Sequence, residues 1–228
     1  MILAAGRGER MRPLTDHTPK PLLAAGGKPL IVWHLDRLAA AGFREVVINH
    51  AHLGAQIEAA LGDGTRFGLS IVYSAEPPGA LETAGGIASA LPLLGEAPIL
   101  VINGDIFCDW DVGQAPLIAA ALKDDLAHLV MVANPEHHPR GDFALDKGRC
   151  HSAPSAAHAP LFTFSGTGIY NPALFAEVGI GQRAKLAPLL IEAMNADRVA
   201  GSFHAGKWID VGTPQRLAAL DAELRALR

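Results

Sequence analysis

The chain has 228 residues, half of them hydrophobic, so it can bury a sizeable core without disulfides or a structural metal. A formal net charge of -4 gives no broad positive field, which argues against sequence-independent nucleic-acid binding. Cys108 and Cys150 stand in neither a CxxC nor a Cys/His spacing, and no apolar run is long enough to span a membrane. We therefore expect a cytoplasmic protein without a disulfide framework, a zinc site or membrane contact.

The first half of the chain alternates short apolar runs with amphipathic stretches. This alternation is typical of βαβ units and of a covered, mostly parallel sheet. The expected strands are Ile2–Ala5, Glu45–Asn49, Leu69–Ser74 and Pro98–Asn103. The expected helices, where apolar residues recur at three- and four-residue spacing, are Leu30–Ala41, Leu53–Leu61 and Thr83–Leu91. Gly42, Gly62 and Gly95 stand where helix C-caps are expected.

The second half has a looser pattern, and its residues 135–160, rich in His, Pro, Ala and Ser, predict loops and short hairpins. The expected helices are Pro116–Leu122, Pro172–Val178, Leu186–Asn195 and a terminal helix from Pro214 onward. The expected strands are His128–Ala133, Leu161–Tyr170 and Gly201–Trp208. No internal repeat or long linker is present, so we expect a single domain whose second half completes the same sheet and walls a pocket.

The most informative segment runs from Leu3 to Leu14 and is followed by Thr18-Pro19-Lys20-Pro21-Leu22. A predicted strand passes into a Gly6-Arg7-Gly8 turn, whose backbone N–H groups can form a concave anion site. Four cations lie in the same stretch, namely Arg7, Arg10, Arg12 and Lys20. Together they suit a polyphosphate, although a tight turn with a solvated basic face is the plain alternative. Met11 replaces the third glycine of a dinucleotide-binding loop, and the Gly-Lys-Ser/Thr ending of a P-loop is absent.

Two aspartates follow predicted strands. Asp105 directly follows the run Ile99–Gly104, and Asp210 lies in Trp208-Ile209-Asp210-Val211-Gly212-Thr213-Pro214. Ligand crevices of open parallel sheets lie at the carboxyl ends of strands, and Mg²⁺ prefers one or two protein carboxylates with phosphates and waters. Each aspartate taken alone fits a helix cap or a turn equally well.

The motif Leu-Ala-Ala-Gly-x-Gly-x-Arg-Met-x-Pro-Leu-Thr with Pro-Lys-Pro-Leu downstream resembles the sugar-1-phosphate nucleotidylyltransferases. The resemblance implies an α/β, Rossmann-like three-layer fold with a mixed, mostly parallel central sheet. It implies a nucleotide-binding half (about 1–110) and a sugar-binding half (about 111–228). It also implies catalytic roles for Arg10 at the departing pyrophosphate, Lys20 at the nucleotide phosphates and Asp105. The matching Gly-Asp and late Trp-x-Asp-x-Gly-Thr motifs make Asp105 and Asp210 the expected Mg²⁺ ligands.

Further contacts are implied residue by residue. The implied nucleotide contacts are Leu3, Ala4, Ala5, Gly6, Gly8, Glu9, Arg10, Lys20, Glu76, Ala80, Gly85 and Gly104. The implied sugar contacts are Glu82, Asn103, Asp142, Ser165 and Gly166. For the segment that begins at Glu76 and reaches Thr83, a helix capping box is the alternative, and the two readings can coexist.

Within the family, the chain is most similar to bacterial N-acetylmuramate-1-phosphate uridylyltransferases of cell-wall recycling, through segments such as Asn49–Leu53 and Asn134–Phe143. The expected substrates are UTP and N-acetylmuramic acid 1-phosphate, and the expected state is a monomer. The alternatives are a mannose-1-phosphate guanylyltransferase, a glucose-1-phosphate nucleotidylyltransferase, or a nucleotide-sugar sensor without activity. Many relatives bind the sugar phosphate with a Glu-Lys-Pro lysine that residues 148–160 lack, so Lys185 or Arg140 would have to replace it.

Overall fold

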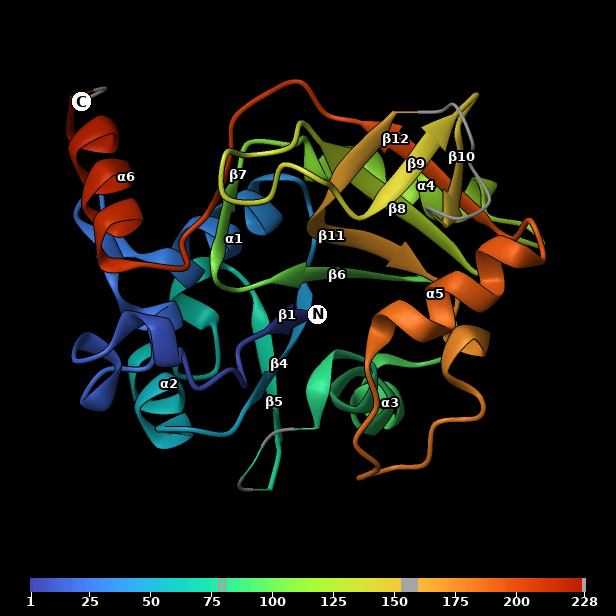
Figure 1. Cartoon of the computed structure of the whole chain (residues 1–228). Helices are drawn as coiled ribbons and strands as arrows, with labels where there is room; N and C mark the ends of the chain where they lie inside the picture. The colour runs from blue at the N-terminus through green and yellow to red at the C-terminus, as the bar shows by residue number, and fades with distance from the viewer. Residues whose placement is uncertain (78, 80, 153–159, 227–228) are drawn as a thin grey trace. The chain divides into compact units, whose positions relative to one another are not determined.

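The computed structural model describes residues 1–77, 79, 81–152 and 160–226. The chain forms two compact units (Figure 1). The first contains Met1–Leu81, Asn103–Gly113 and Lys207–Arg228, and the second contains Glu82–Ile102 and Gln114–Gly206. Segments far apart in sequence therefore build each unit.

Three parallel strands form the base of the first unit. Strands β1 (Ile2–Leu3), β4 (Glu45–His50) and β5 (Ser70–Ala75) lie in the order β5-β4-β1. Both pairings are parallel, and Ile2 lies opposite Ile48. The carboxyl ends of β1 and β4 therefore lie at the same edge, and β1 leads directly into the glycine turn.

Two short antiparallel ribbons and three helices complete this unit. One ribbon pairs β2 (Ala24–Ala25) with β3 (Lys28–Pro29), and the other pairs β7 (Ile106–Cys108) with β13 (Trp208–Asp210). The helices are α1 (Leu30–Ala40), α2 (Gly54–Leu61) and α6 (Pro214–Ala226). Helix α1 packs against β3 and β7, and α6 packs against β2 and β13.

A buried apolar cluster joins the start of the chain to its end within the first unit. Its members are Met11, Leu23, Ala25, Leu30, Val211, Leu217, Leu220 and Leu224. Met11 belongs to the loop after β1, and Val211 directly follows Asp210; both are fully buried. Burial of these side chains therefore fixes the glycine turn and the late aspartate in one packed region.

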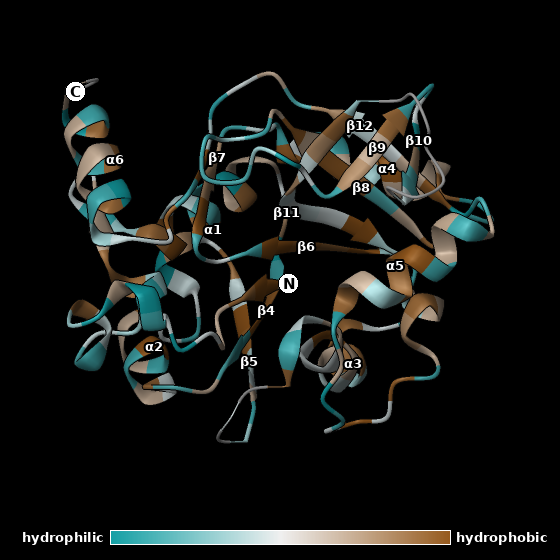
Figure 2. Cartoon of the chain, in the orientation of Figure 1, coloured by the Kyte–Doolittle hydropathy of each residue, from teal (hydrophilic) through white to brown (hydrophobic). Residues whose placement is uncertain are grey.

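The second unit holds a mixed sheet. Its strands are β6 (Ile99–Asn103, of which only Asn103 belongs to the first unit), β8 (Ala127–Val132), β9 (Phe143–Asp146), β10 (Arg149–Ser152), β11 (Leu161–Tyr170) and β12 (Val199–Phe203). They lie in the order β6-β11-β8-β12-β10-β9; β12 and β8 are parallel, whereas β11 runs antiparallel to β6 and β8. Its helices are α3 (Glu82–Leu94), α4 (Ala115–Ala121) and α5 (Leu186–Asn195). Figure 2 shows β6 largely in brown, as expected for a strand whose side chains are buried.

Most predicted elements are present, and two differ. The predicted bounds of β11 and α5 are confirmed, and Gly42, Gly62 and Gly95 have the positive φ expected after a helix. The single strand predicted over Gly201–Trp208 is wrong, because β12 pairs with β8 whereas β13 pairs with β7. The helix predicted over Pro172–Val178 is a single 3₁₀ turn over Pro172–Phe175.

The region predicted as loops and short hairpins contains the β9–β10 hairpin, and its residues 153–159 lie outside the described residues. Among the described residues, none of the helices combines the length and the apolar character needed to cross a membrane.

Candidate active site

The turn after β1 requires glycine at position 8. Gly8 has φ 69° and ψ 38°, in the left-handed region. A Cβ there would lie 2.9 Å from Thr15 Cγ2 and 3.3 Å from Lys20 Cβ. The Thr15 hydroxyl and the Met11 amide both donate to the Gly8 carbonyl, each at 2.9 Å. The loop is therefore folded back against the segment that carries Lys20.

The loop's acidic side chains offset two of its arginines. Arg7 lies 3.4 Å from Glu9 and 3.7 Å from Asp16, and Arg12 lies 2.8 Å from Asp16. Arg10 is exposed, and among the described residues its guanidinium has no ion-pair partner. Of the three loop arginines, Arg10 is therefore the one whose charge is left for a ligand. Glu9, predicted to contact the nucleotide, instead has its carboxylate within ion-pair distance of Arg7 in this structure.

Lys20 joins the glycine turn to the first aspartate. Only 6% of the residue is exposed, and its Nζ donates to Asp105 Oδ2 at 2.6 Å. A buried ammonium needs such a partner because desolvation disfavours its charge. The contact also sets Asp105 beside the turn, since Lys20 Cβ lies next to Gly8.

Asp105 directly precedes β7, and Asp210 is the last residue of the neighbouring strand β13. In the β7–β13 ribbon Asp210 stands opposite Ile106, and the Val211 amide donates to the Asp105 carbonyl at 3.2 Å. The structure thus brings together Gly8, Lys20, Asp105 and Asp210, which the sequence separates widely.

Arg216 is a member of this group that sequence analysis missed. Its Nη1 lies 3.1 Å from Asp210 Oδ2. A Cβ on Gly212 would lie 2.4 Å from Arg216 Nη2 and 3.0 Å from Asp210 Oδ1, so a larger residue would require the ends of these side chains to shift. The glycine two residues after Asp210, with an arginine one helical turn later, was the available signal.

The carboxylate pair fits a hard divalent cation. Two carboxylates, one at the end of β13 and one in the turn before β7, would leave the remaining positions to phosphate and water, as Mg²⁺ prefers. No cluster of three or more His, Cys, Asp or Glu side chains that could hold a metal occurs in the described part of the chain. Lys20 and Arg216 offset the two negative charges in this structure.

A buried carboxylate connects the end of β1 to the segment after β5. The Ala4 amide donates to Asn49 Oδ1 at 2.9 Å, and Asn49 Nδ2 donates to Glu76 Oε1 at 2.5 Å. Glu76 Oε2 accepts from the Leu81 amide at 2.8 Å. Both oxygens of Glu76 therefore already accept hydrogen bonds that shape the segment. Ala80, predicted to contact the base, lies outside the described residues.

Close backbone approach explains Gly104. Its amide donates to the Leu3 carbonyl at 2.8 Å, and a Cβ there would lie 2.7 Å from the same oxygen. Ala5 is buried and Gly6 has open space where a Cβ would stand, so this stretch leaves room beside the turn. The residue before Gly104 is Asn103, the last residue of β6.

The other predicted contacts belong to the second unit. At the start of α3, the Glu82 carboxylate pairs with Arg183 at 2.8 Å and the Gly85 amide donates to the Ala184 carbonyl at 3.1 Å. The oxygens of Asp142 accept from His138 Nε2 and from the Phe164 amide. Buried Ser165 accepts from the Thr167 amide, and Gly166 has φ 81° where the β11–β8 register shifts.

His34 of α1 is a buried residue that sequence analysis did not single out. Its Nε2–H donates to the Ile106 carbonyl at 2.9 Å, next to Asp105. Burial, and to a smaller extent Arg37, lowers the pKa of His34 from 6.5 to about 4. The imidazole is therefore neutral at pH 7 and serves as a donor.

This shift predicts acid sensitivity. Between about pH 4 and 6.5 the unfolded chain binds a proton at His34 that the native chain does not, so stability rises with pH across that window. Acidification from pH 7 to 4.5 should cost the wild type about 2–3 kcal/mol more than His34→Gln, which keeps the donor but does not titrate. Urea unfolding at both pH values measures this difference. The exposed control His17→Gln should behave as wild type, and an equal loss in wild type and His34→Gln would contradict the prediction.

The chain is similar to known proteins over nearly its whole length. A family model described as "Nucleotidyl transferase" matches residues 1–226. The chain is 56% identical over 223 residues to the N-acetylmuramate alpha-1-phosphate uridylyltransferase of Neisseria meningitidis serogroup B, covering 97% of this chain and 96% of the relative. It is 37% identical to the enzyme of the same name from Caulobacter vibrioides, covering 98% and 96%.

A solved structure shares the fold. The crystal structure titled as a putative glucose-1-phosphate thymidylyltransferase from Bacillus anthracis, in complex with sucrose, superposes with a TM-score of 0.83 at 21% identity, covering 100% of this chain and 95% of that one. This similarity confirms the predicted α/β nucleotide-sugar transferase fold with a mixed sheet. With a model that spans nearly the whole chain and relatives that match it end to end, the chain belongs to the nucleotidyl transferase family.

Proposed function

We propose that the chain transfers the uridylyl group of UTP to N-acetylmuramic acid 1-phosphate, giving UDP-N-acetylmuramic acid and pyrophosphate. The observation that carries the proposal is the 56% identity to a uridylyltransferase of that sugar phosphate over 97% of the chain. Because one family model covers residues 1–226, we treat both units as one catalytic domain. The proposal includes a monomer that works in the cytoplasm, in the recycling of peptidoglycan.

The proposed reaction is an in-line displacement. A phosphate oxygen of the sugar phosphate attacks the α-phosphorus of UTP, and the bond between that phosphorus and the bridging oxygen to the β-phosphate breaks. The electron pair leaves with pyrophosphate. Because the attacking phosphate is already anionic at neutral pH, the chain needs neither a nucleophilic side chain nor a general base.

The chain's own groups have complementary roles in this proposal. Amides of the Gly6–Gly8 turn and the free charge of Arg10 receive the β- and γ-phosphates, and Lys20 contacts the α-phosphate. Asp105 and Asp210 hold Mg²⁺, which when bound offsets charge on the α-phosphate and the attacking phosphate. The pair between buried Lys20 and partly exposed Asp105 supports this assignment, since it gives the side chains fixed positions before any ligand arrives.

The residues proposed to contact the base and those proposed to contact the sugar are argued from different observations. Glu76 shapes the base segment through Asn49 and Leu81, and we propose that Glu76 and backbone groups of that segment contact the base. For the sugar we propose Asn103 and four second-unit residues, which are Glu82, Asp142, Ser165 and Gly166. Lys185 and Arg140 are the candidate cations for the sugar phosphate, replacing the lysine that residues 148–160 lack.

The test is a substrate panel read by pyrophosphate release. UTP, GTP, ATP and dTTP are each combined with the 1-phosphates of N-acetylmuramic acid, N-acetylglucosamine, mannose and glucose, with Mg²⁺. We expect UTP with N-acetylmuramic acid 1-phosphate to give the highest kcat/KM, and EDTA to abolish turnover. Activity confined to GTP and mannose 1-phosphate would overturn the substrate assignment. Tight binding of UDP-N-acetylmuramic acid by calorimetry, with no turnover of any pair, would show a sensor instead.

A further inference from the structure

Strand β7 has two edges, and one of them pairs with β13, the strand that ends at Asp210. The Asp109 amide donates to the Lys207 carbonyl at 3.0 Å, and the Val211 amide donates to the Asp105 carbonyl at 3.2 Å. Phe107 stands opposite Ile209 between these two bonds. The backbone groups of the odd-numbered positions therefore point toward β13, and their pairing sets Asp105 opposite Val211, the residue after Asp210.

The opposite edge belongs to the even-numbered positions, because successive residues of a strand direct their carbonyls to opposite sides. Among the described residues β7 pairs with no strand other than β13. Its other carbonyls would therefore lack donors unless another element supplied them. Ile106, Cys108 and Trp110 are all buried, so water is not available to do so.

Helix α1 supplies these donors from two side chains. His34 Nε2–H donates to the Ile106 carbonyl at 2.9 Å, and the Arg37 guanidinium donates to the carbonyls of Cys108 and Trp110. Positions 34 and 37 lie on one face of the helix because they are three residues apart. The two side chains thus take the place of a third strand along the free edge of β7.

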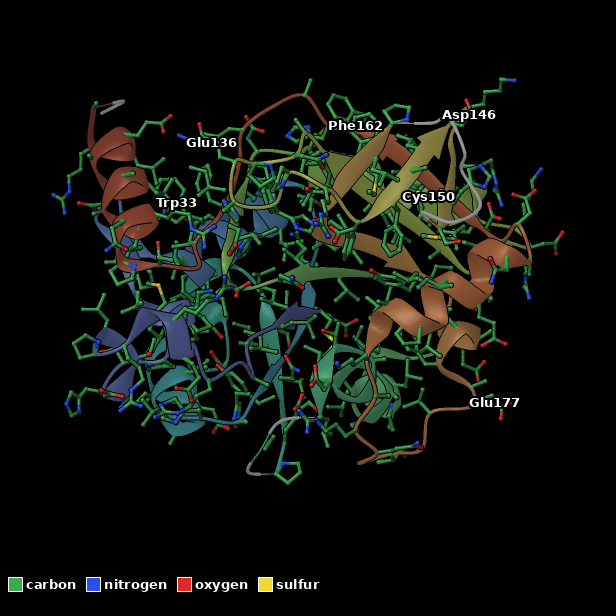
Figure 3. All side chains as sticks on the ribbon, viewed as in Figure 1. Trp33, Glu136, Asp146, Cys150, Phe162 and Glu177 are labelled. Atoms are coloured by element: carbon green, nitrogen blue, oxygen red, sulfur yellow. The ribbon has the colours of Figure 1, made fainter. Side chains whose placement is uncertain are left out.

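The helix that holds these donors is itself fixed within the first unit. Trp33, labelled in Figure 3, donates from Nε1 to the Ala25 carbonyl at 3.0 Å and packs edge-on against Phe107 with ring centroids 5.6 Å apart. Leu30 at the start of the helix belongs to the buried cluster that contains Val211. The position of the ribbon is therefore set relative to an anchored helix.

We propose that His34 and Arg37 are positioning residues for the Asp105–Asp210 pair. Their hydrogen bonds to alternate carbonyls fix the position of β7 relative to α1. Through the β7–β13 pairing they fix the backbone of Asp105 relative to the backbone of Asp210. The inference concerns a metal site and so rests on the proposed function for its kinetic readout, but metal binding tests it separately.

The experiment compares His34→Leu, which has no donor, with His34→Gln, whose Nε2 can replace the imidazole donor. Mn²⁺ affinity of the chain alone is measured by calorimetry, with Asp210→Asn to identify the site. The half-saturating Mg²⁺, kcat and the KM for UTP come from pyrophosphate release. We expect His34→Leu to weaken Mn²⁺ binding and raise half-saturating Mg²⁺ about tenfold, as loss of an outer partner of a metal ligand does. kcat should fall more than the KM for UTP changes, and His34→Gln should restore all values to within about twofold.

A second variant and a matched control distinguish a positioning role from a folding defect. Arg37→Lys keeps the charge but can serve fewer carbonyls, and it should raise the amide exchange rates of Asp109 and Val211. Asp36 lies on the same helix and pairs with Lys28 rather than with β7. The control variant Asp36→Asn should therefore leave Mn²⁺ affinity unchanged.

The outcomes separate the two proposals. If His34→Leu lowers the melting temperature but leaves Mn²⁺ affinity and half-saturating Mg²⁺ as in wild type, His34 only supports packing and the inference is overturned. Failure of the wild type to bind Mn²⁺ would overturn it as well. If the wild type turns over no substrate pair while His34→Leu still weakens Mn²⁺ binding, the proposed function fails and the positioning role stands.

Discussion

Asp105→Asn is expected to lower kcat for pyrophosphate release by about 10³-fold, because loss of a metal ligand removes several kcal/mol of transition-state stabilisation. The substitution keeps the size of the side chain and its backbone bond to Val211, so β7 and β13 should still pair. It also leaves Lys20 without its ion-pair partner, and urea unfolding should show a lower stability. The rate is measured at saturating UTP and sugar phosphate over a Mg²⁺ series.

Asp36 provides the matched control. Its carboxylate is also paired with a lysine, Lys28, away from the aspartate pair. Asp36→Asn should leave kcat within about twofold, as surface substitutions away from a site usually do. Near-normal turnover in both Asp105→Asn and Asp210→Asn would remove the metal assignment.

The alternating apolar pattern predicted the parallel part of the fold well. Strands β1, β4, β5 and β6 lie where periodicity placed them, and a strand that ends at the glycine turn is a local feature of sequence. Strand β11 and helix α5 have the predicted bounds because each is long enough for its period to show. In these elements local preference and tertiary burial agree.

The apolar pattern did not predict short strands that are defined only by the strands they pair with. Strand β13 has three residues, too few for a period, and it merged with β12 in the predicted strand over Gly201–Trp208. Only their pairing with β8 and β7 distinguishes them, and pairing is not visible in one sequence.

In the candidate site, too, local motifs were predictable from the sequence, whereas contacts between distant side chains were not. The resemblance to the sugar-1-phosphate nucleotidylyltransferases predicted Gly8, Lys20, Asp105 and Asp210 as one site. It could not show which loop cations are offset by Glu9 and Asp16, because that depends on side-chain placement. His34 was hidden in an apolar helix, although a histidine and an arginine three residues apart on such a helix can mark donors for a buried strand edge.

Lys20→Met should lower kcat/KM for UTP by about 10²–10³-fold, because a buried cation aimed at developing phosphate charge contributes about as much as an oxyanion-hole donor. Methionine fills much the same volume, so the packing next to Gly8 should hold. Lys28→Met is the control, since Lys28 pairs with Asp36 away from the aspartate pair. Steady-state kinetics on the UTP series measures both variants.

A double-mutant cycle distinguishes a shared role from two separate ones. Lys20 Nζ and Asp105 Oδ2 lie 2.6 Å apart, so each side chain holds the other in place before the nucleotide arrives. If they act as one unit, Lys20→Met combined with Asp105→Asn should cost far less than the product of the single losses. Multiplicative losses would mean that Lys20 meets the phosphates independently of the metal pair. Unchanged kinetics in Lys20→Met would instead mean that the glycine turn does not receive the triphosphate, because no other buried cation borders Gly8 among the described residues.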